Sequence, residues 1–365
     1  MKELIISALI GYLLSLPLLV SAQKTPDLKK ETETFLQDAM AKHHIPGLAY
    51  AIVKDGSIIH QGQLGKANLS WNAAVDRETA FQTASCSKLF TALLLGRLFE
   101  EKILLPEQKL EELLDSIPSS WQGITVKQLA SHQSGIGMAD FSKATTTKEA
   151  LELAKKQEMT NEPGTRSFYV SSDYWILQYL IEQETGRPFF EVLTQYVLEP
   201  LGMQHTYVNN NDDTGIRTHQ LIPKEAAVYA YQDGKYVVSD MQFAKTGYSA
   251  GGIYTSIEDM AKIAQVLDEG KFLKPETQQL LLTPVALKED GFGSFGIGFI
   301  AQDYQGHKVS GHSGGPALAD FVRFDKQKLT FIVLSNQRGF PPYLSFTLAS
   351  FFISGLEKPV LPEHL

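Results

Sequence analysis

Strand-like and helix-like segments alternate along this chain in a way that leaves few folds open. Near the start, two short runs at 48–53 and 57–64 are rich in strand-forming residues, and Asp55-Gly56, a dipeptide typical of hairpin turns, joins them. Further strand-like runs come late in the chain, at 296–303, 307–310, 319–324 and 329–335. Because helical patterns fill most of the chain between, we predict an α+β fold. One antiparallel sheet, flanked by helices, is built from both chain ends and an all-helical subdomain is inserted.

Length and composition agree with one large domain. The chain has 365 residues, of which 43% are hydrophobic, enough for an extensive core. We place the α/β part at about 23–84 and 247–365, and the helical part at about 85–246. Pockets commonly form where two such parts meet, so an active site is expected at this boundary.

The first residues have the pattern of a secretory signal peptide. An apolar stretch at 4–20 follows Lys2 and ends in small residues, which suits cleavage between Ala22 and Gln23. We therefore predict a signal peptide at 1–22, a mature domain at 23–365 and a secreted or periplasmic protein. The alternative is an uncleaved N-terminal anchor; no membrane contact is predicted beyond this segment.

Charge and cysteine content exclude several classes of partner. The net charge is −8 and no basic cluster is present, which argues against nucleic acid. The only cysteine is Cys86, so neither an internal disulfide nor a cysteine-rich zinc site can form. We expect no metal and no cofactor, and a small-molecule or peptide substrate as the partner.

Ser85-Cys86-Ser87-Lys88 begins a long apolar run and contains two candidate catalytic residues. Residues three apart lie on one helical face, so the Ser85 hydroxyl and the Lys88 amine can meet. A hydroxyl beside an amine is the arrangement of a serine nucleophile that a neighbouring base activates. The spacing alone is not specific, since Ser21 and Lys24 also match it. Cys86 is expected to point away from this face as a packing residue.

Further segments in a fixed order supply the specificity that the spacing lacks. Together they resemble signatures of the serine β-lactamase and penicillin-binding-protein superfamily, in particular the class C β-lactamase branch, which also holds DD-peptidases, esterases and aminopeptidases. The segments are 123–135, 162–171, 199–203, 250–260 and 311–315. The resemblance implies a β-lactamase/transpeptidase-like fold.

The resemblance also implies roles for individual residues. Ser85 would be the acylated nucleophile, with Lys88 as its proton partner and Tyr169 as general base. Whether Tyr169 or Lys88 is the base stays open, because burial can lower the pKa of a lysine. The matching substrate-binding and oxyanion residues are Ser171, His312, Ser313, Gly314 and Gly315, with the backbone N–H groups of Ser85 and Gly315 forming the oxyanion hole.

Residues 311–315 also spell Gly-x-Ser-x-Gly, which in an α/β-hydrolase marks the nucleophile. Such a serine needs an acid and then a histidine downstream, and the only later histidine is His364 in the tail. A trypsin-like serine segment would require an all-β fold, which the helical middle contradicts. Context therefore favours Ser85.

Two departures from the family pattern bear on the substrate. Ser171 stands where an asparagine is usual, and His312 where true β-lactamases have lysine. An imidazole that titrates near neutrality would bind a substrate carboxylate only while protonated, so we expect turnover of anionic substrates to fall as pH rises between about 5 and 8.

We therefore predict an exported serine hydrolase that acts through an acyl-enzyme on ester or amide bonds of small or peptide-like substrates. The types that the sequence leaves open are esterase, DD-peptidase and β-lactamase. The alternative is a catalytically silent homologue that binds peptides or cell-wall fragments as a sensor or scaffold. It rests on the Ser171 departure alone.

Overall fold

A computed structural model describes residues 27–141, 144–208, 212–213, 217–218, 221–239, 241–289, 291–315, 318–339 and 344–359. The predicted signal peptide at 1–22 lies outside these residues. Among those described, no helix is long and apolar enough to cross a membrane.

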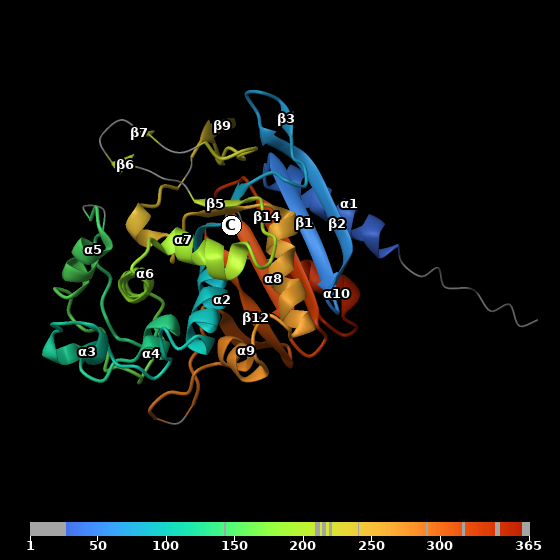
Figure 1. The fold of residues 1–365 in the computed structure, drawn as a ribbon. Coiled ribbons are helices and arrows are strands. Elements are labelled where there is room, and N and C mark those ends of the chain that lie inside the picture. Colours follow the sequence, from blue (N-terminus) through green and yellow to red (C-terminus); the bar gives the residue numbers. More distant parts are fainter. Residues whose placement is uncertain are drawn as a thin grey trace, which may run out of the picture.

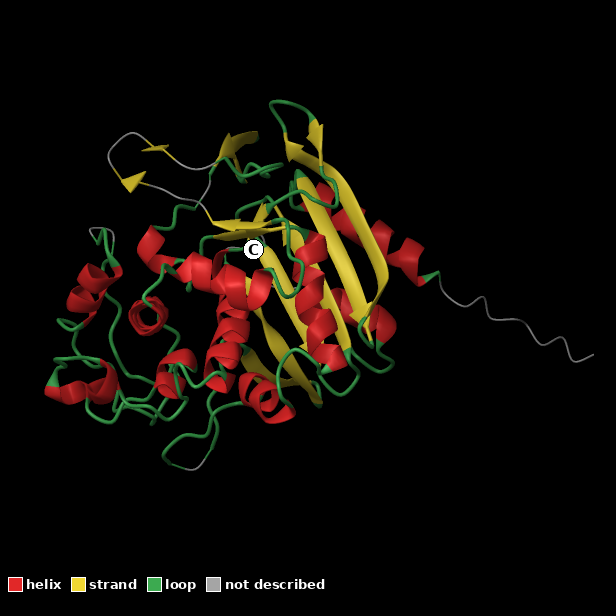
Figure 2. Ribbon diagram, viewed as in Figure 1, coloured by secondary structure: helices red, strands yellow, loops and turns green. Residues whose placement is uncertain are grey.

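The central element is a seven-stranded antiparallel sheet assembled from both ends of the chain, as predicted (Figure 2). Its strand order is β11-β12-β13-β14-β1-β2-β3. Strands β1 and β14 join the two halves, with Leu48 opposite Ser335. The strands are β1 (Gly47–Lys54), β2 (Ser57–Asn68), β3 (Ala73–Ala74), β11 (Ile300–Tyr304), β12 (His307–Gly314), β13 (Ala319–Phe324) and β14 (Leu329–Ser335).

The β1–β2 hairpin forms where Asp55-Gly56 predicts it. Both turn residues have positive φ, +49° at Asp55 and +77° at Gly56, as a two-residue turn between twisted strands requires. The Gly56 N–H donates to the Asp268 carboxylate at 2.8 Å, which ties the turn to helix α8 (Ile257–Glu269).

Both faces of the sheet are covered, so its central strands are buried on each side. Along β1, Tyr50 and Ile52 pack with Leu36 and Leu348 on one face, and Ala49 packs into the core of the other. Helices α1 (Leu28–Lys42) and α10 (Leu344–Phe352) cover the first face, and α8 (Ile257–Glu269) covers the second (Figure 1).

Helices dominate the chain between the two halves of the sheet and pack beside it (Figure 2). They are α2 (Ser87–Glu100), α3 (Leu110–Leu113), η2 (Ser119–Trp121), α4 (Val126–Ala130), α5 (Thr147–Ala154), α6 (Ser171–Thr185), α7 (Phe189–Leu193) and η3 (Thr194–Leu198), and η4 (Lys245–Gly247) follows later. Helix α9 (Pro275–Leu282) precedes β11.

Short strands accompany these helices. Three of them form a small sheet in the order β4-β10-β5. The short strands are β4 (Phe81–Gln82), β5 (Thr206–Val208), β6 (Asp212–Asp213), β7 (Arg217–Thr218), β8 (Tyr229–Gln232), β9 (Lys235–Val238) and β10 (Ile253–Thr255).

Helix α2 lies between the sheet and the helical part (Figure 1). Its residues from Ser87 to Gly96 are all buried, as expected of a helix that is apolar on every side. One hydrophobic core runs through both parts around this helix. The division of the chain near residues 85 and 246 therefore stays a prediction. Because α2 contacts both parts, residues from both can meet at its N-terminal end.

Candidate active site

Ser85 lies on a short 3-10 turn, η1 (Ala84–Cys86), directly before α2. Ala84 has φ +44°, in the left-handed region that residues with a Cβ rarely adopt. Such backbone strain persists where the surroundings fix it. Here the Thr83 hydroxyl donates to the carbonyl of Ile253 on β10 at 2.7 Å. The turn leaves Ser85 half-buried, whereas its neighbours Ala84 and Cys86 are fully buried.

Lys88 is completely buried, one helical turn after Ser85. Its Nζ donates to the carbonyl oxygen of Ala250 at 2.7 Å and lies 5.1 Å and 4.9 Å from the ring centroids of Tyr169 and Tyr174. No carboxylate of the described residues forms an ion pair with it. Burial lowers the pKa of Lys88 to about 7, so much of the amine is neutral at physiological pH.

Tyr169 lies beside both groups and remains 39% exposed. Burial of the phenol raises the pKa of Tyr169 to about 12, although its contact with the Ser85 hydroxyl acts in the opposite direction. Burial also raises the pKa of Tyr174, which is fully buried, well above its usual range. Tyr169 is therefore protonated at neutral pH in the free protein.

His312, on β12, faces the same site. Its ring centroid lies 5.9 Å from that of Tyr169. Its Nδ1 lies 2.8 Å from the carbonyl oxygen of Ser313, an acceptor, so Nδ1 carries the hydrogen. The buried Nε2 has no hydrogen-bond partner among the described residues. Burial and the nearby Lys88 lower the pKa of His312 to about 3. The expectation that His312 titrates near neutrality is therefore wrong, because the sequence does not reveal how deeply the ring is buried.

The end of β12 packs closely against the turn that contains Ser85. A Cβ on Gly314 would lie 2.0 Å from the Thr83 carbonyl oxygen, so only glycine allows this approach. Gly315 follows and is exposed, with open space where its Cβ would be. The structure thus brings the 312–315 segment beside Ser85.

Ser313 lines a cavity of about 140 Å³ on the face of the sheet that α10 covers, opposite the face that packs on α2. Asp320 of β13, opposite Ser313 in the register, and Phe346 of α10 also line it. Asp320 is 6% exposed, and burial raises the pKa of its carboxyl to about 7. The remaining walls are mainly apolar, and no lysine or arginine of the described residues lines the cavity.

Ser171 is the first residue of α6 and is half-buried, two positions after Tyr169. Cys86 is fully buried and its Sγ lies 3.0 Å from the carbonyl oxygen of His312. Burial raises the pKa of the Cys86 thiol, which agrees with a packing residue. No group of three or more potential metal ligands occurs in the part of the chain that the structure describes.

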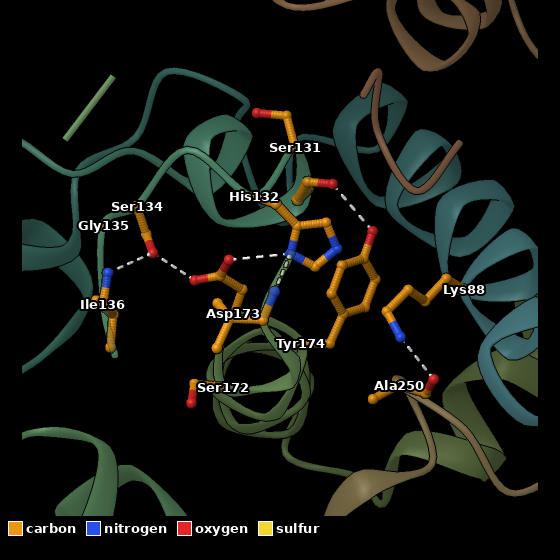
Figure 3. A network of polar contacts seen from close by, with 12 residues as sticks. Lys88, Ser131, His132, Ser134, Gly135, Ile136, Ser172, Asp173, Tyr174 and Ala250 are labelled. Carbon is orange, nitrogen blue, oxygen red and sulfur yellow. Dashed lines mark hydrogen bonds and ion pairs between the residues drawn. The ribbon is translucent and has the colours of Figure 1, made fainter. Parts of the chain in front are cut away.

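Sequence reasoning missed a buried polar pair at the edge of this site. His132 Nδ1 lies 3.1 Å from Asp173 Oδ2 (Figure 3). The His132 ring centroid lies 4.6 Å from that of Tyr169. His132 belongs to the segment 123–135 that carried the family resemblance. Asp173 is 41 residues away, so no local spacing links the two.

Comparison with known proteins places the whole arrangement in a family context. The model of the family described as Beta-lactamase matches residues 32–347. A penicillin-binding protein of Bacillus subtilis is 24% identical over 85% of this chain and 72% of its own length. A D-aminopeptidase of Brucella anthropi is 27% identical over 77% of this chain and 54% of its own length. The solved structure of an octameric penicillin-binding protein homologue from Pyrococcus abyssi superposes with a TM-score of 0.75. It is 25% identical and covers 88% of this chain and 77% of that one.

Proposed function

Because the chain belongs to the Beta-lactamase family of serine hydrolases, we propose that it hydrolyses ester or amide bonds through an acyl-enzyme on Ser85. The observation that carries this proposal is the environment of Lys88. A fully buried lysine without an acidic partner serves stability poorly, since a charged amine in an apolar core is costly. One turn from an accessible serine, an amine with a pKa of about 7 is a suitable general base.

In the proposed first step, Ser85 Oγ forms a bond to the substrate carbonyl carbon while its proton moves to the neutral amine of Lys88. The carbonyl π electrons move to oxygen, and the backbone N–H groups of Ser85 and Gly315 donate to the resulting oxyanion. The approach of Gly314 to Thr83 supports this assignment, because it brings the two donor segments together.

Tyr169 is proposed as the acid rather than the first base. With a pKa of about 12 its phenol keeps its proton at neutral pH, and it contacts Ser85. When the tetrahedral intermediate collapses, Tyr169 donates its proton to the leaving group and regains one from the Lys88 ammonium. A water molecule then attacks the acyl-enzyme, the same groups move its protons, and Ser85 is released.

The substrate side of the site favours groups that donate hydrogen bonds over carboxylates. His312 is neutral and offers an Nε2 that can accept but not donate, with no partner among the described residues. We propose small or peptide-like esters and amides with an uncharged or ammonium group at this position. The similarity to a D-aminopeptidase is consistent with that choice. Ser171 is proposed to contact the substrate through its hydroxyl.

The test is labelling and turnover. A fluorophosphonate probe should label the wild type at one site, and a nitrophenyl ester should be hydrolysed; Ser85→Ala should lose both. Ser119→Ala, which removes an exposed serine on η2, is the matched control. Equal labelling of wild type and Ser85→Ala would remove Ser85 as nucleophile.

The same experiment addresses the silent sensor or scaffold. Turnover that Ser85→Ala abolishes excludes that function. A folded wild type that binds peptide but neither labels nor turns over substrate supports it.

Export remains part of the proposal. Its support is the apolar stretch at 4–20 with small residues before Gln23. N-terminal sequencing of protein recovered outside the cytoplasm should begin at Gln23. Protein that keeps Met1 and stays with the membrane would instead indicate an anchor.

A further inference from the structure

His132 is held in a strained and buried position. Its backbone has φ +56° and only 2% of the residue is exposed. Its ring lies among three aromatic rings, with centroids 4.6 Å from Tyr169, 5.2 Å from Tyr174 and 4.9 Å from Phe295. A non-glycine residue at this φ indicates a constraint that the surroundings impose on the imidazole.

The contacts of Nδ1 decide where the ring hydrogen is. The Val170 N–H donates to His132 Nδ1 at 3.4 Å, and Asp173 Oδ2 lies 3.1 Å from the same atom (Figure 3). A backbone N–H is only a donor, so Nδ1 has to offer its lone pair. The hydrogen between Nδ1 and Oδ2 then belongs to the carboxyl of Asp173.

The other carboxyl oxygen has the complementary role. The Ile136 N–H donates to Ser134 Oγ at 3.0 Å, so the Ser134 hydrogen is free to point elsewhere. It points to Oδ1 of Asp173, with which Ser134 Oγ forms a short contact. Oδ1 therefore accepts while Oδ2 donates, the pattern of a neutral carboxylic acid.

Burial supports the same protonation state. Asp173 has no exposed surface, and its only ion-pair contact in the described part of the chain is His132. Burial raises the pKa of Asp173 well above its usual range. Burial first, and then Lys88 and His312, lower the pKa of His132 well below its usual range.

We propose that Asp173 and His132 form a neutral pair in which the protonated carboxyl fixes the Nε2–H tautomer of the imidazole beside Tyr169 and Lys88. In this pair His132 is a positioning residue for the Tyr169 ring. Its Nε2 lies on the side of Tyr174 and Lys88 (Figure 3) and has no partner among the described residues. It thus presents a donor into the site, whereas His312 presents an acceptor. The tautomer is inferred from contacts in the structure alone, whereas the role of this pair in turnover rests on the proposed function.

The arrangement is the reverse of a serine-protease triad, in which an aspartate carboxylate accepts from the histidine Nδ1–H. The difference predicts opposite effects of Asp173→Asn. An asparagine amide can donate to Nδ1 and accept from Ser134, and so reproduces a neutral acid. If Asp173 were instead a carboxylate that accepts from Nδ1–H, the asparagine amide could not replace it without changing the tautomer of His132.

Nitrogen NMR of the full-length protein labelled at histidine tests the tautomer directly. His132→Gln and His312→Gln identify the two rings among the nine histidines. His132 should show hydrogen on Nε2 and His312 hydrogen on Nδ1, so His312 serves as the internal control. Hydrogen on Nδ1 of His132 in the wild type overturns the proposal. This readout needs no substrate, so it is independent of whether Ser85 is the nucleophile.

Kinetics of the Asp173 variants then test the positioning role. Asp173→Asn should keep the His132 tautomer and lose less than about tenfold in kcat, against a loss of about 10⁴-fold expected for a triad aspartate. Leucine is apolar and cannot donate to Nδ1, so Asp173→Leu should no longer fix the His132 tautomer. It should lower kcat by a much larger factor than it changes KM. A variant melting curve close to that of wild type confirms folding. Equal kcat losses in Asp173→Asn and Asp173→Leu would reject the positioning role.

Discussion

The amine of Lys88 and the carbonyl oxygen of Ala250 lie 2.7 Å apart in a site that is closed to solvent on the lysine side. A carbonyl dipole stabilises an ammonium less than a carboxylate does, so the site holds the Lys88 side chain without compensating a positive charge on it. The low pKa of Lys88 follows from this arrangement, and two predictions depend on it.

The first prediction concerns stability. The unfolded chain keeps Lys88 protonated up to about 10.5, while the folded protein releases the proton near 7. The unfolded state therefore binds more protons in this window, and the Lys88 contribution makes the unfolding free energy rise with pH from about 7 to 10. Lys88→Met should stabilise the protein at pH 6 by roughly 2–4 kcal/mol, with a smaller gain at pH 9. Urea unfolding at both pH values measures this, and a gain independent of pH would contradict it.

The second prediction concerns rate. If neutral Lys88 is the base, kcat/KM for an uncharged ester should rise with pH through about 7 and then level off. Lys88→Arg keeps a permanent charge at this position and should lose about 10²–10⁴-fold in kcat/KM. Stopped assays from pH 5 to 9 show the profile. A plateau extending below pH 6 would mean that Lys88 is not the base.

The third prediction concerns His312 and charge on the substrate. Because the pKa of His312 is about 3, its charge should not affect turnover between pH 5 and 8. Two esters with the same leaving group, one carrying a carboxylate and one uncharged, should then keep a constant ratio of kcat/KM over that range. His312→Lys should raise the ratio by about tenfold in favour of the anion, the effect of one new charged hydrogen bond. A ratio that falls with pH in the wild type would show that His312 is protonated after all.

The fourth prediction concerns the contact between Gly314 and Thr83. Gly314→Ala places a carbon 2.0 Å from the Thr83 carbonyl oxygen, so β12 has to move away from Ser85. We expect a loss of about 10²–10³-fold in acylation rate, comparable to losing one oxyanion donor. Gly315→Ala adds its carbon in open space and should lose far less. Similar losses in both variants would argue against the contact as the cause.

The fifth prediction concerns Asp320 in the cavity between the sheet and α10. Its folded pKa of about 7 lies above the ordinary 3.8, so the folded state holds a proton that the unfolded chain has lost. The Asp320 contribution therefore lowers the unfolding free energy as pH rises from about 4 to 7. Asp320→Asn should flatten this part of the pH–stability curve, measured by thermal melts at pH 4.5 and 7.5. An unchanged curve would show that the carboxyl is solvated and ordinary.

The sequence predicted the sheet well and the chemistry of the site only in part. Hydrophobic patterns and Asp55-Gly56 located the strands because such signals are local. Burial is not local, and so the protonation of His312 was predicted wrongly. The His132–Asp173 pair was missed for the same reason, because only the folded chain brings a residue of the segment after α4 onto the first turn of α6.

The pairing of β1 with β14 also affects how the chain acquires its structure during synthesis. The Gly47 N–H donates to the Asn336 side chain at 2.8 Å, across 289 residues of sequence. At a usual translation rate, roughly 15–60 s pass between the emergence of these two residues from the ribosome. Throughout that interval the hydrogen-bonding edge of β1 is unpaired, and exposed edges of this kind invite association with other chains. A nascent chain of this protein is therefore expected to depend on chaperones until its last strands have been made.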